Sequence, residues 1–415
     1  MTHKFNKNFH VENMFLLVIS CLPSFSICLW PYNDNIINTN CSITSLFTEI
    51  TDSCGFHQGV PENAIIDTMR IIWKNIPESS SVFVLYDQFQ FWDGTTKINN
   101  NINLNNNRIY HLRNCYVSGY GAVFFEDKFI NSTLPYESLR AIYKPLSGKV
   151  IAHRNLVINT GHYASMNFGH FLQDTISPLI QFPKEILKQA TVFTCNSHKY
   201  LMDTYLPLFE FKEAITMTGN EWLYAKELYI NLNPRCHVAH LGPCWHKLTL
   251  LIRKKFNLTN AKPYRYVLSQ RNHNGNRTAR YIYNLNDIFN SVKRVYPDIN
   301  FEIFLLDNKP LNETIKVWST TKILYTVCGS NCFNCIFFHP TTICIIVFDE
   351  LFDNSALAVV AANFHKVILY QEPSIKHIYS YNILNISRAL SAFKIAIHLD
   401  KYGVWPNETY GKFFI

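Results

Sequence analysis

Four polar residues follow helical spacing in the stretch NFGHFLQDTISPL, residues 167–179. They are His170, Gln173, Asp174 and Ser177, at positions i, i+3, i+4 and i+7. In an α-helix this spacing places them on one stripe, while the apolar residues between them form the opposite, buried face. The stripe would present a base, an amide, an acid and a hydroxyl together. An amphipathic helix with a solvated polar face has the same pattern, so the rest of the chain must decide between these two interpretations.

A group of arginines follows a predicted strand at 264–270. In the stretch SQRNHNGNRTARYIYN, Arg271 ends the strand, and Arg277 and Arg280 precede a predicted helix. Guanidinium groups in such a place can hold a diphosphate through paired, charge-assisted hydrogen bonds. They would neutralise a nucleoside diphosphate as its bond to a sugar breaks. A solvated basic loop is the simpler alternative, and only the α/β context argues against it.

A glycine junction occurs later, in the stretch TVCGSNCFNCIFF. Gly329 and Ser330 end a predicted strand and begin a helix, whose free N–H groups favour an anion. The same stretch places Cys328, Cys332 and Cys335 in the C-x3-C-x2-C spacing of a radical-SAM iron–sulfur cluster. Such enzymes need a large barrel after the motif, and only 80 residues follow Cys335.

These cysteines also have a zinc interpretation, with His339 as a fourth ligand. We disfavour it because four ligands on one short helix cannot converge tetrahedrally around one ion. An iron–sulfur cluster would require reduced thiolates, which a secretory compartment disfavours. Cys332 and Cys335 are therefore interpreted mainly as small buried hydrophobic residues.

The elements that position these groups alternate regularly in the second half of the chain. Predicted strands lie at 264–270, 299–306, 322–329, 341–348 and 366–371, and predicted helices at 284–296, 311–321, 331–338 and 355–365. This alternation implies parallel crossovers, so this half should form a doubly wound sheet. Ligands bind outside the carboxyl ends of the strands in such sheets, where the arginines and the glycine junction lie. The first half has a less regular α/β pattern, with strand-like runs at 80–92 and 106–130.

The N-terminus contains one clear targeting signal. Residues 14–30 are apolar and uncharged, follow Lys4 and Lys7, and precede Asp34. This pattern predicts a signal anchor or a cleavable signal peptide, with the bulk of the chain in the secretory lumen. We therefore expect the endoplasmic reticulum or Golgi lumen. The chain would be a single-pass type II membrane protein held through its N-terminal segment, or secreted if that segment is cleaved.

Composition fits a large globular chain. The 415 residues are 48% hydrophobic and 16% charged, enough for two domains with full cores. The net charge of +8 suits a phosphate-bearing partner. The sequence has no dense run of Lys and Arg, so it does not support nucleic-acid binding. Seven Asn-x-Ser/Thr sequons agree with a luminal location. Of the twelve cysteines, Cys41 with Cys54, and Cys236 with Cys244, are near-neighbour candidates for disulfides.

In this order and spacing, the three motifs resemble the pattern of glycosyltransferase family 61, over roughly residues 110–370. That family typically shows an Asn-aromatic-Gly-His segment with an Asp four residues after the His. A Ser-x-Arg strand end follows, with Arg-x-x-x-Asn, and then His-Gly-Ala-Gly-x-x-Asn with an aromatic residue and a Pro. The matching residues are Asn167, Gly169, His170, Asp174, Ser269, Arg271, Arg280, Asn284, Gly329, Asn334, Phe338 and Pro340.

The chain departs from the family pattern around the glycine junction. Cys328 stands where the family has a His. The family's acidic residue after the next strand begins is missing, with Val347 near its place and Asp349 or Glu350 slightly beyond. These departures raise a second hypothesis, a catalytically inactive, lectin-like luminal or surface protein of the same fold. A radical-SAM enzyme is the third.

The resemblance implies a GT-B architecture, with two facing Rossmann-like α/β domains, of which the C-terminal one is a doubly wound parallel sheet that holds the donor. It implies inverting transfer of a hexose or pentose from a nucleotide-sugar, by our expectation a UDP-sugar, to a hydroxyl of a glycan or glycoprotein. We predict His170 and Asp174 as catalytic residues, and Asn167 and Gln173 as acceptor-binding or positioning residues. The predicted donor-binding residues are Arg271, Arg280, Asn284, Gly329, Ser330 and Asn334.

No Asp-x-Asp motif occupies a suitable loop, so we expect no obligatory metal, and no cofactor besides the nucleotide-sugar co-substrate. The predicted domain organisation has five parts. Residues 1–31 form the signal anchor or signal peptide, 32–60 a stem, 61–255 an N-terminal acceptor-side α/β domain, 256–375 a C-terminal nucleotide-sugar-binding domain, and 376–415 a segment that packs back on the domains.

Overall fold

The computed structural model describes most of the chain between Glu49 and Phe413. The described ranges are 49–50, 55–58, 65–70, 82–85, 108–126, 128–131, 148–161, 165–217, 221–231, 242–271, 280–305, 310–348, 353–373, 382–407 and 411–413. The predicted membrane segment at 14–30, most of the stem, Arg277, Asp349 and Glu350 lie outside them. Across the described ranges, no helix combines the length and the apolar character that crossing a membrane requires.

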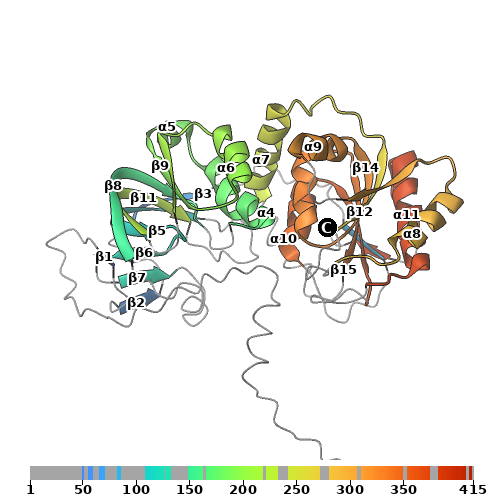
Figure 1. The fold of residues 1–415 in the computed structure, drawn as a ribbon, viewed down its shortest axis with the longest axis horizontal. Coiled ribbons are helices and arrows are strands. Elements are labelled where there is room, and N and C mark those ends of the chain that lie inside the picture. The colour runs from blue at the N-terminus through green and yellow to red at the C-terminus, as the bar shows by residue number, and fades with distance from the viewer. Residues whose placement is uncertain are drawn as a thin grey trace, which may run out of the picture.

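Two sheets divide the described chain into two lobes, which stand side by side in Figure 1. The second lobe has a seven-stranded sheet with the order β13-β12-β14-β15-β16-β4-β17. Its strands are β4 (Val82–Leu85), β12 (Arg265–Gln270), β13 (Phe301–Leu305), β14 (Thr321–Val327), β15 (Ile343–Phe348), β16 (Lys366–Gln371) and β17 (Gly411–Phe413). Neighbours are parallel except β17, which is antiparallel to β4. The predicted parallel sheet is therefore confirmed.

Helices cover both faces of the second sheet, as in a doubly wound fold. On one face lie α8 (Leu285–Val295) and α11 (Ile386–Tyr402), and on the other α9 (Leu311–Ser319), η5 (Ser330–Phe337) and α10 (Asn354–Ala362). Side chains of β14 alternate between the two faces, since Ile323 and Tyr325 belong to the α8–α11 core and Leu324 to the other. The predicted helix at 331–338 is present as the 3-10 helix η5.

The first lobe has a ten-stranded sheet with the order β10-β9-β8-β11-β5-β6-β7-β2, with β1 beside β8 and β3 beside β5. Its strands are β1 (Glu49–Ile50), β2 (Gly55–Gln58), β3 (Ile65–Arg70), β5 (Arg108–Ser118), β6 (Val123–Phe125), β7 (Lys128–Asn131), β8 (Gly148–Asn159), β9 (Thr191–Cys195), β10 (Glu213–Met217) and β11 (Glu221–Asn231). The four strands β10, β9, β8 and β11 are parallel. From β11 through β7 the pairing is antiparallel.

Short helices accompany the parallel part of this first sheet. They are α5 (Lys184–Gln189), α6 (Lys199–Tyr205) and η4 (Leu206–Leu208), and Leu187, Leu201 and Tyr205 from them share one core with Val192 of β9. Parallel strands need such crossover helices, whereas the antiparallel pairs β5–β6 and β6–β7 are joined by short connections. The predicted α/β fold of GT-B type, with a doubly wound parallel sheet in the C-terminal half, is confirmed.

Strand β4 belongs to the second sheet, although it lies in the sequence between β3 and β5 of the first sheet. It comes from the stretch 80–92, which the sequence pattern groups with the N-terminal domain, yet it pairs with β16 in the second sheet, where Val82 lies opposite Val367. The ring of Phe83 is buried there and stacks 5.4 Å from Trp405. A short apolar run specifies a strand without specifying which sheet the strand extends, so the sequence could not have placed β4.

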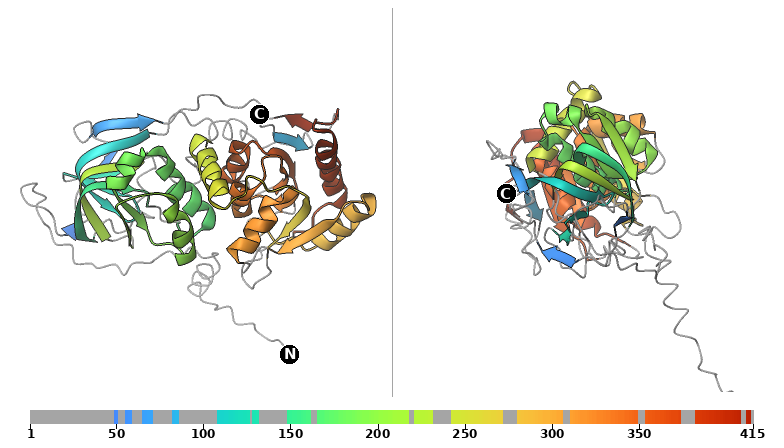
Figure 2. Two further views of the ribbon diagram at one scale, coloured as in Figure 1. Left: turned by 90° about the horizontal axis from the view of Figure 1, so that it is seen from above. Right: turned by 90° about the vertical axis from the view of Figure 1, so that its left-hand side faces the viewer.

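One hydrophobic core continues from one lobe into the other. It includes Phe171 of the first lobe, Trp245 of α7 (Gly242–Lys255) and Phe333 of η5. Helix α7 lies between the lobes in Figures 1 and 2, and the Trp245 and Phe333 rings meet edge to face at 5.6 Å. A Cβ on Gly169 would lie 2.9 Å from the Phe333 ring. The two lobes thus meet closely where residue 169 has no side chain.

Candidate functional site

The predicted helix at 167–179 is present but is not a regular α-helix. It begins as α4 (Phe168–His170), continues as the π-helical η2 (Phe171–Ile176) and ends as the 3-10 helix η3 (Ser177–Gln181). Asn167 caps it, since its side-chain oxygen accepts a hydrogen bond of 2.9 Å from the Gly169 N–H. Pro178, which has no N–H to donate, interrupts the ladder at the start of η3. π-Helical turns are frequent at functional sites.

The polar stripe of this helix does not face solvent. Gln173, Asp174 and Ser177 are 1%, 5% and 0% exposed. Burying polar side chains is unfavourable unless hydrogen bonds replace those made with water. The alternative of a solvated polar face is therefore excluded.

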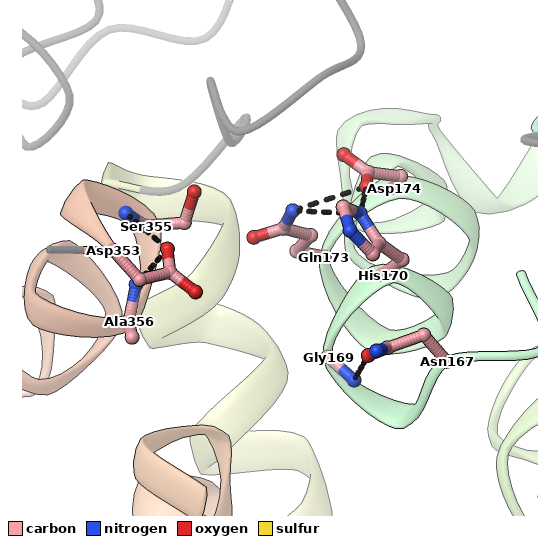
Figure 3. A network of polar contacts seen from close by, with 8 residues as sticks. All are labelled: Asn167, Gly169, His170, Gln173, Asp174, Asp353, Ser355 and Ala356. Atoms are coloured by element: carbon pink, nitrogen blue, oxygen red, sulfur yellow. Dashed lines mark hydrogen bonds and ion pairs between the residues drawn. The ribbon is translucent and has the colours of Figure 1, made fainter. Parts of the chain in front are cut away.

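His170, Gln173 and Asp174 form one hydrogen-bonded group, drawn in Figure 3. His170 Nδ1 lies 2.8 Å from Asp174 Oδ2. The amide Nε2 of Gln173 donates to the same oxygen at 3.0 Å and lies 3.4 Å from His170 Nδ1. An Nδ1–H that donates to Asp174 leaves the lone pair of the neutral ring on Nε2. The group has the arrangement of a base that is oriented by an acid.

Charges around His170 determine how it binds a proton. Burial lowers the pKa of His170, but the hydrogen bond and charge of Asp174, together with the charge of Asp353, raise it by more. The resulting pKa is above the ordinary value of 6.5. His170 therefore holds a proton more tightly than an isolated imidazole does.

The arginine and glycine motifs meet in the second lobe. The guanidinium of Arg280 lies against the backbone of Gly329, so a Cβ on Gly329 would overlap Nη1 and lie 2.6 Å from Cζ. Gly329 also has a φ of +139°, which side chains other than hydrogen rarely allow. The backbone conformation therefore favours glycine at this junction, and the Arg280 guanidinium occupies the space that a Cβ would take. The backbone of Arg280 itself is left-handed, with a φ of +71°.

The environment of Arg280 suits an anion. Burial lowers the pKa of its guanidinium, and the charge of Asp353 acts in the opposite direction. Within the ranges that the structure describes, the guanidinium makes no hydrogen bond or ion pair, although it carries five N–H donors. A partly buried cation with donors to spare can be satisfied by phosphate oxygens.

Sheet topology explains why these groups coincide. The strand order of the second sheet reverses at β12, which has β13 on one side and β14 on the other. Ligands of doubly wound sheets bind at such a switch point, outside the carboxyl ends of the two strands. Arg271 directly follows β12, and Gly329 and Ser330 follow β14. The charge of Arg271 acts on Cys332 in η5, so the two loops lie close together.

Two predicted donor-binding residues have their amides engaged by the backbone. Asn284 Nδ2 donates to the Leu384 carbonyl at 2.8 Å, and its Oδ1 accepts from the Leu384 N–H at 2.9 Å. Asn334 Nδ2 donates to the Asn331 carbonyl at 3.1 Å. The structure therefore shows these amides holding loops in place, and direct contact with the donor stays a prediction.

Asp353 is a candidate site residue that the sequence analysis missed. Its Oδ1 caps α10 by accepting hydrogen bonds from the N–H groups of Ser355 at 3.0 Å and Ala356 at 3.1 Å. Its charge acts on both His170 and Arg280, so it lies close to both halves of the site. The available signal was an Asp directly before the apolar run of a predicted helix, the pattern of an N-cap.

The buried cysteines behave as core residues. Cys332 and Cys335 are 1% and 0% exposed, and burial raises the pKa of Cys332 to about 12. Burial in the apolar core therefore favours their neutral thiol form. Among the residues that the structure describes, no group of three or more His, Cys, Asp or Glu could hold a metal ion. Cys244 is a buried free thiol, so the suggested disulfide with Cys236 is not formed.

Comparison with known families identifies the class of protein, since the chain carries the sequence pattern of a glycosyltransferase. The matching family model is Glycosyltransferase 61, over residues 168–345. This match to glycosyltransferase family 61 confirms the resemblance predicted from the sequence. The matched range contains the His170–Asp174 pair, Arg280 and Gly329. A search of curated proteins finds no match to the chain.

Proposed function

We propose that the protein transfers a sugar, with inversion, from a nucleotide-sugar to a hydroxyl of a glycan or glycoprotein. One observation carries the proposal: the charge of Asp353 acts both on His170, which is paired with Asp174, and on Arg280, which lies against Gly329. Both groups lie within the family-matched range. The first lobe supplies a base and the second a cation, which are the two groups that displacement at an anomeric carbon needs. A UDP-sugar with a hexose or pentose is the donor that we expect.

The base acts in a single displacement. The acceptor hydroxyl attacks the anomeric carbon while Nε2 of His170 takes its proton. Asp174 holds the ring through Nδ1 and stabilises the imidazolium that forms. The bond between the anomeric carbon and the diphosphate oxygen breaks on the opposite side, and its electron pair leaves with the diphosphate. Asn167 contributes to the position of the acceptor, and Gln173, through its Nε2, helps to position the His170–Asp174 pair.

The cationic side stabilises the departing diphosphate. Arg280 and Arg271 donate charge-assisted hydrogen bonds to its oxygens, and the N–H groups at Ser330 add to them. The guanidinium groups supply the positive charge that a divalent metal supplies in other transferases. We therefore expect that chelators leave transfer intact, and loss of all transfer in a chelator would contradict this part of the proposal.

We infer that the protein acts in the lumen of the endoplasmic reticulum or Golgi, attached through residues 14–30, or is secreted after their removal. The apolar run and its flanking charges support this setting. Four sequon residues are exposed in the structure, as glycosylation requires: Asn257, Asn312, Asn385 and Asn407. Digestion of the expressed protein with a glycosidase that removes N-linked glycans would shift its mass if the chain enters the lumen.

The experiment that tests the function has two stages. Thermal unfolding of the full-length protein is measured against nucleoside diphosphates and nucleotide-sugars, because a ligand at a hundred times its Kd stabilises by about 2.7 kcal/mol. Release of the nucleoside diphosphate is then followed with candidate acceptors. A selective shift with turnover supports the transferase. A shift without turnover on any acceptor would favour the lectin-like alternative, which the Cys328 departure motivates.

A further inference from the structure

Gln173 carries a buried hydrogen-bond acceptor that the mechanism above leaves unused. Its side chain is 1% exposed, and its Oε1 accepts no hydrogen bond from the part of the chain that the structure describes. The amide cannot turn freely, since its Nε2 donates to Asp174 Oδ2 at 3.0 Å. A buried acceptor without a donor is unfavourable, so a donor from a bound molecule is expected at this oxygen.

The oxygen of Gln173 faces the other lobe. Figure 3 shows it pointing away from His170 and Asp174, toward the N-terminal end of α10, where Asp353 and Ser355 lie. The Asp353 carboxylate is held in place there by its two cap bonds, both made by Oδ1. Its charge acts on His170, the neighbour of Gln173 on the same helical turn. Two hydrogen-bond acceptors therefore face each other from opposite lobes.

Two facing acceptors select the chemistry of a ligand. Sugar hydroxyls can donate a hydrogen bond to each of them, whereas an ionised carboxylate has no proton to donate. The negative charges of Asp174 and Asp353 would also repel a carboxylate. The cation of this site, Arg280, lies at Gly329, where the proposed function uses it for the diphosphate.

We propose that Gln173 Oε1 and the Asp353 carboxylate form a hydroxyl-binding subsite between the lobes, which holds the transferred sugar by its ring hydroxyls and disfavours sugars that carry a carboxylate. This inference rests on the proposed function and narrows it to neutral sugars. Asp353 lies beside the donor side of the site, because its backbone carbonyl accepts a hydrogen bond of 3.7 Å from Sγ of Cys328, the residue before Gly329. The Asp353 charge also acts on Arg280. The hydroxyls are therefore those of the donor sugar rather than those of the acceptor.

Calorimetric binding to the full-length protein, without acceptor, tests the subsite. The probes are UDP, UDP-glucose, UDP-xylose and UDP-glucuronic acid. UDP-glucose and UDP-glucuronic acid differ only at C6, where a hydroxymethyl group becomes a carboxylate. We expect at least one neutral UDP-sugar to bind ten times more tightly than UDP and than UDP-glucuronic acid.

Two variants separate the subsite from a general effect on folding. Gln173→Met keeps the length of the side chain without an acceptor, and should reduce the affinity for that neutral UDP-sugar to that for UDP. Asp353→Asn keeps an oxygen that caps α10 and removes the charge, and should reduce the preference over UDP-glucuronic acid at least threefold. Asp287→Asn, an exposed acid in the first turn of α8, is the matched control and should change neither ratio.

The outcomes distinguish two failures. If UDP itself does not bind, the proposal of a UDP-sugar donor is wrong, and the proposed subsite is overturned as well. If UDP binds but all the UDP-sugars bind equally well, or if Gln173→Met leaves the ratios unchanged, the donor proposal stands and the subsite alone is overturned.

Discussion

The two sides of the site are held in place by different means. On the first lobe, His170 and Asp174 are joined directly by a hydrogen bond of 2.8 Å, and Gln173 reinforces the pair. On the second lobe, Arg280 is positioned by its steric fit against Gly329, with Asp353 attracting it. A base must be oriented before the acceptor arrives, whereas a cation that awaits a diphosphate is best left with its donors unsatisfied. The comparison predicts that the two sides fail differently when altered.

His170→Ala should have the largest effect and should act on turnover alone. Proton transfer by a positioned side chain contributes about 10²–10⁴-fold, so kcat should fall by that order while the Kd for the nucleoside diphosphate changes little. Steady-state kinetics and calorimetry on the same preparation measure both. His198→Ala, an exposed histidine, is the control. Unchanged kcat in well-folded His170→Ala protein would show that His170 is not the base.

Arg280→Met should show the opposite pattern, weaker nucleotide binding with an intact His170–Asp174 pair. A hydrogen bond to a charged group contributes about 1.5–3 kcal/mol, so the Kd for the nucleoside diphosphate should rise roughly tenfold to a hundredfold. Arg294→Met, at an exposed arginine of α8, should leave the Kd unchanged. Equal affinities in Arg280→Met and the wild-type protein would remove Arg280 from the donor site.

Gly329→Ala sharpens the claim that steric fit holds Arg280. The added Cβ overlaps the guanidinium and strains a backbone with φ +139°, so the free energy of unfolding should fall by about 1–3 kcal/mol. Gly403 also has a positive φ, +72°, but a Cβ there meets nothing within 4 Å. The two glycines differ in backbone conformation, so Gly403→Ala measures only the strain of a left-handed residue. Chemical denaturation of Gly329→Ala in the wild-type and Arg280→Met backgrounds isolates the contact with Arg280. Identical losses in the two would mean that backbone strain alone explains the effect.

The smallest expected effect is a change in pH dependence. His170 must be neutral to accept a proton, and its raised pKa places the acid limb of the kcat/KM profile above pH 6.5. Asp353→Asn removes one of the charges that raise this pKa, so the limb should move to lower pH. The shift should be small, because Asp174 contributes more than Asp353. If the limb stays in place or moves to higher pH, the charge of Asp353 does not raise the pKa of His170.

The second sheet could be predicted almost element by element, whereas the first could not. From β12 to β16 each apolar run is flanked by turn residues and followed by a helix with an apolar stripe, so local pattern and topology agree. The antiparallel part of the first sheet depends on pairings between distant residues, for example Trp222 with Ser118. Such pairings are set by packing in three dimensions, which periodicity does not encode.

The site was predictable in its residues more than in its geometry. The spacing of His170 and Asp174 predicted their contact, yet the π-helical turn that follows His170 and contains Asp174 depends on local hydrogen bonds that no spacing rule anticipates. Asp353 could be recognised as a helix cap, but its nearness to His170 and Arg280 follows from the way the lobes pack. Sequence patterns describe one element at a time, and this site is shared by two lobes.

Strand β4 has a consequence for the synthesis of the chain. Roughly 280 residues separate Val82 from its partner Val367, and chains grow at about 5–20 residues per second. The segment that contains β4 therefore waits on the order of tens of seconds before its place in the second sheet exists. During that interval an apolar strand has no native partner, which makes it a binding site for chaperones and a starting point for aggregation. Folding of the second lobe is completed by one of the first segments to be made.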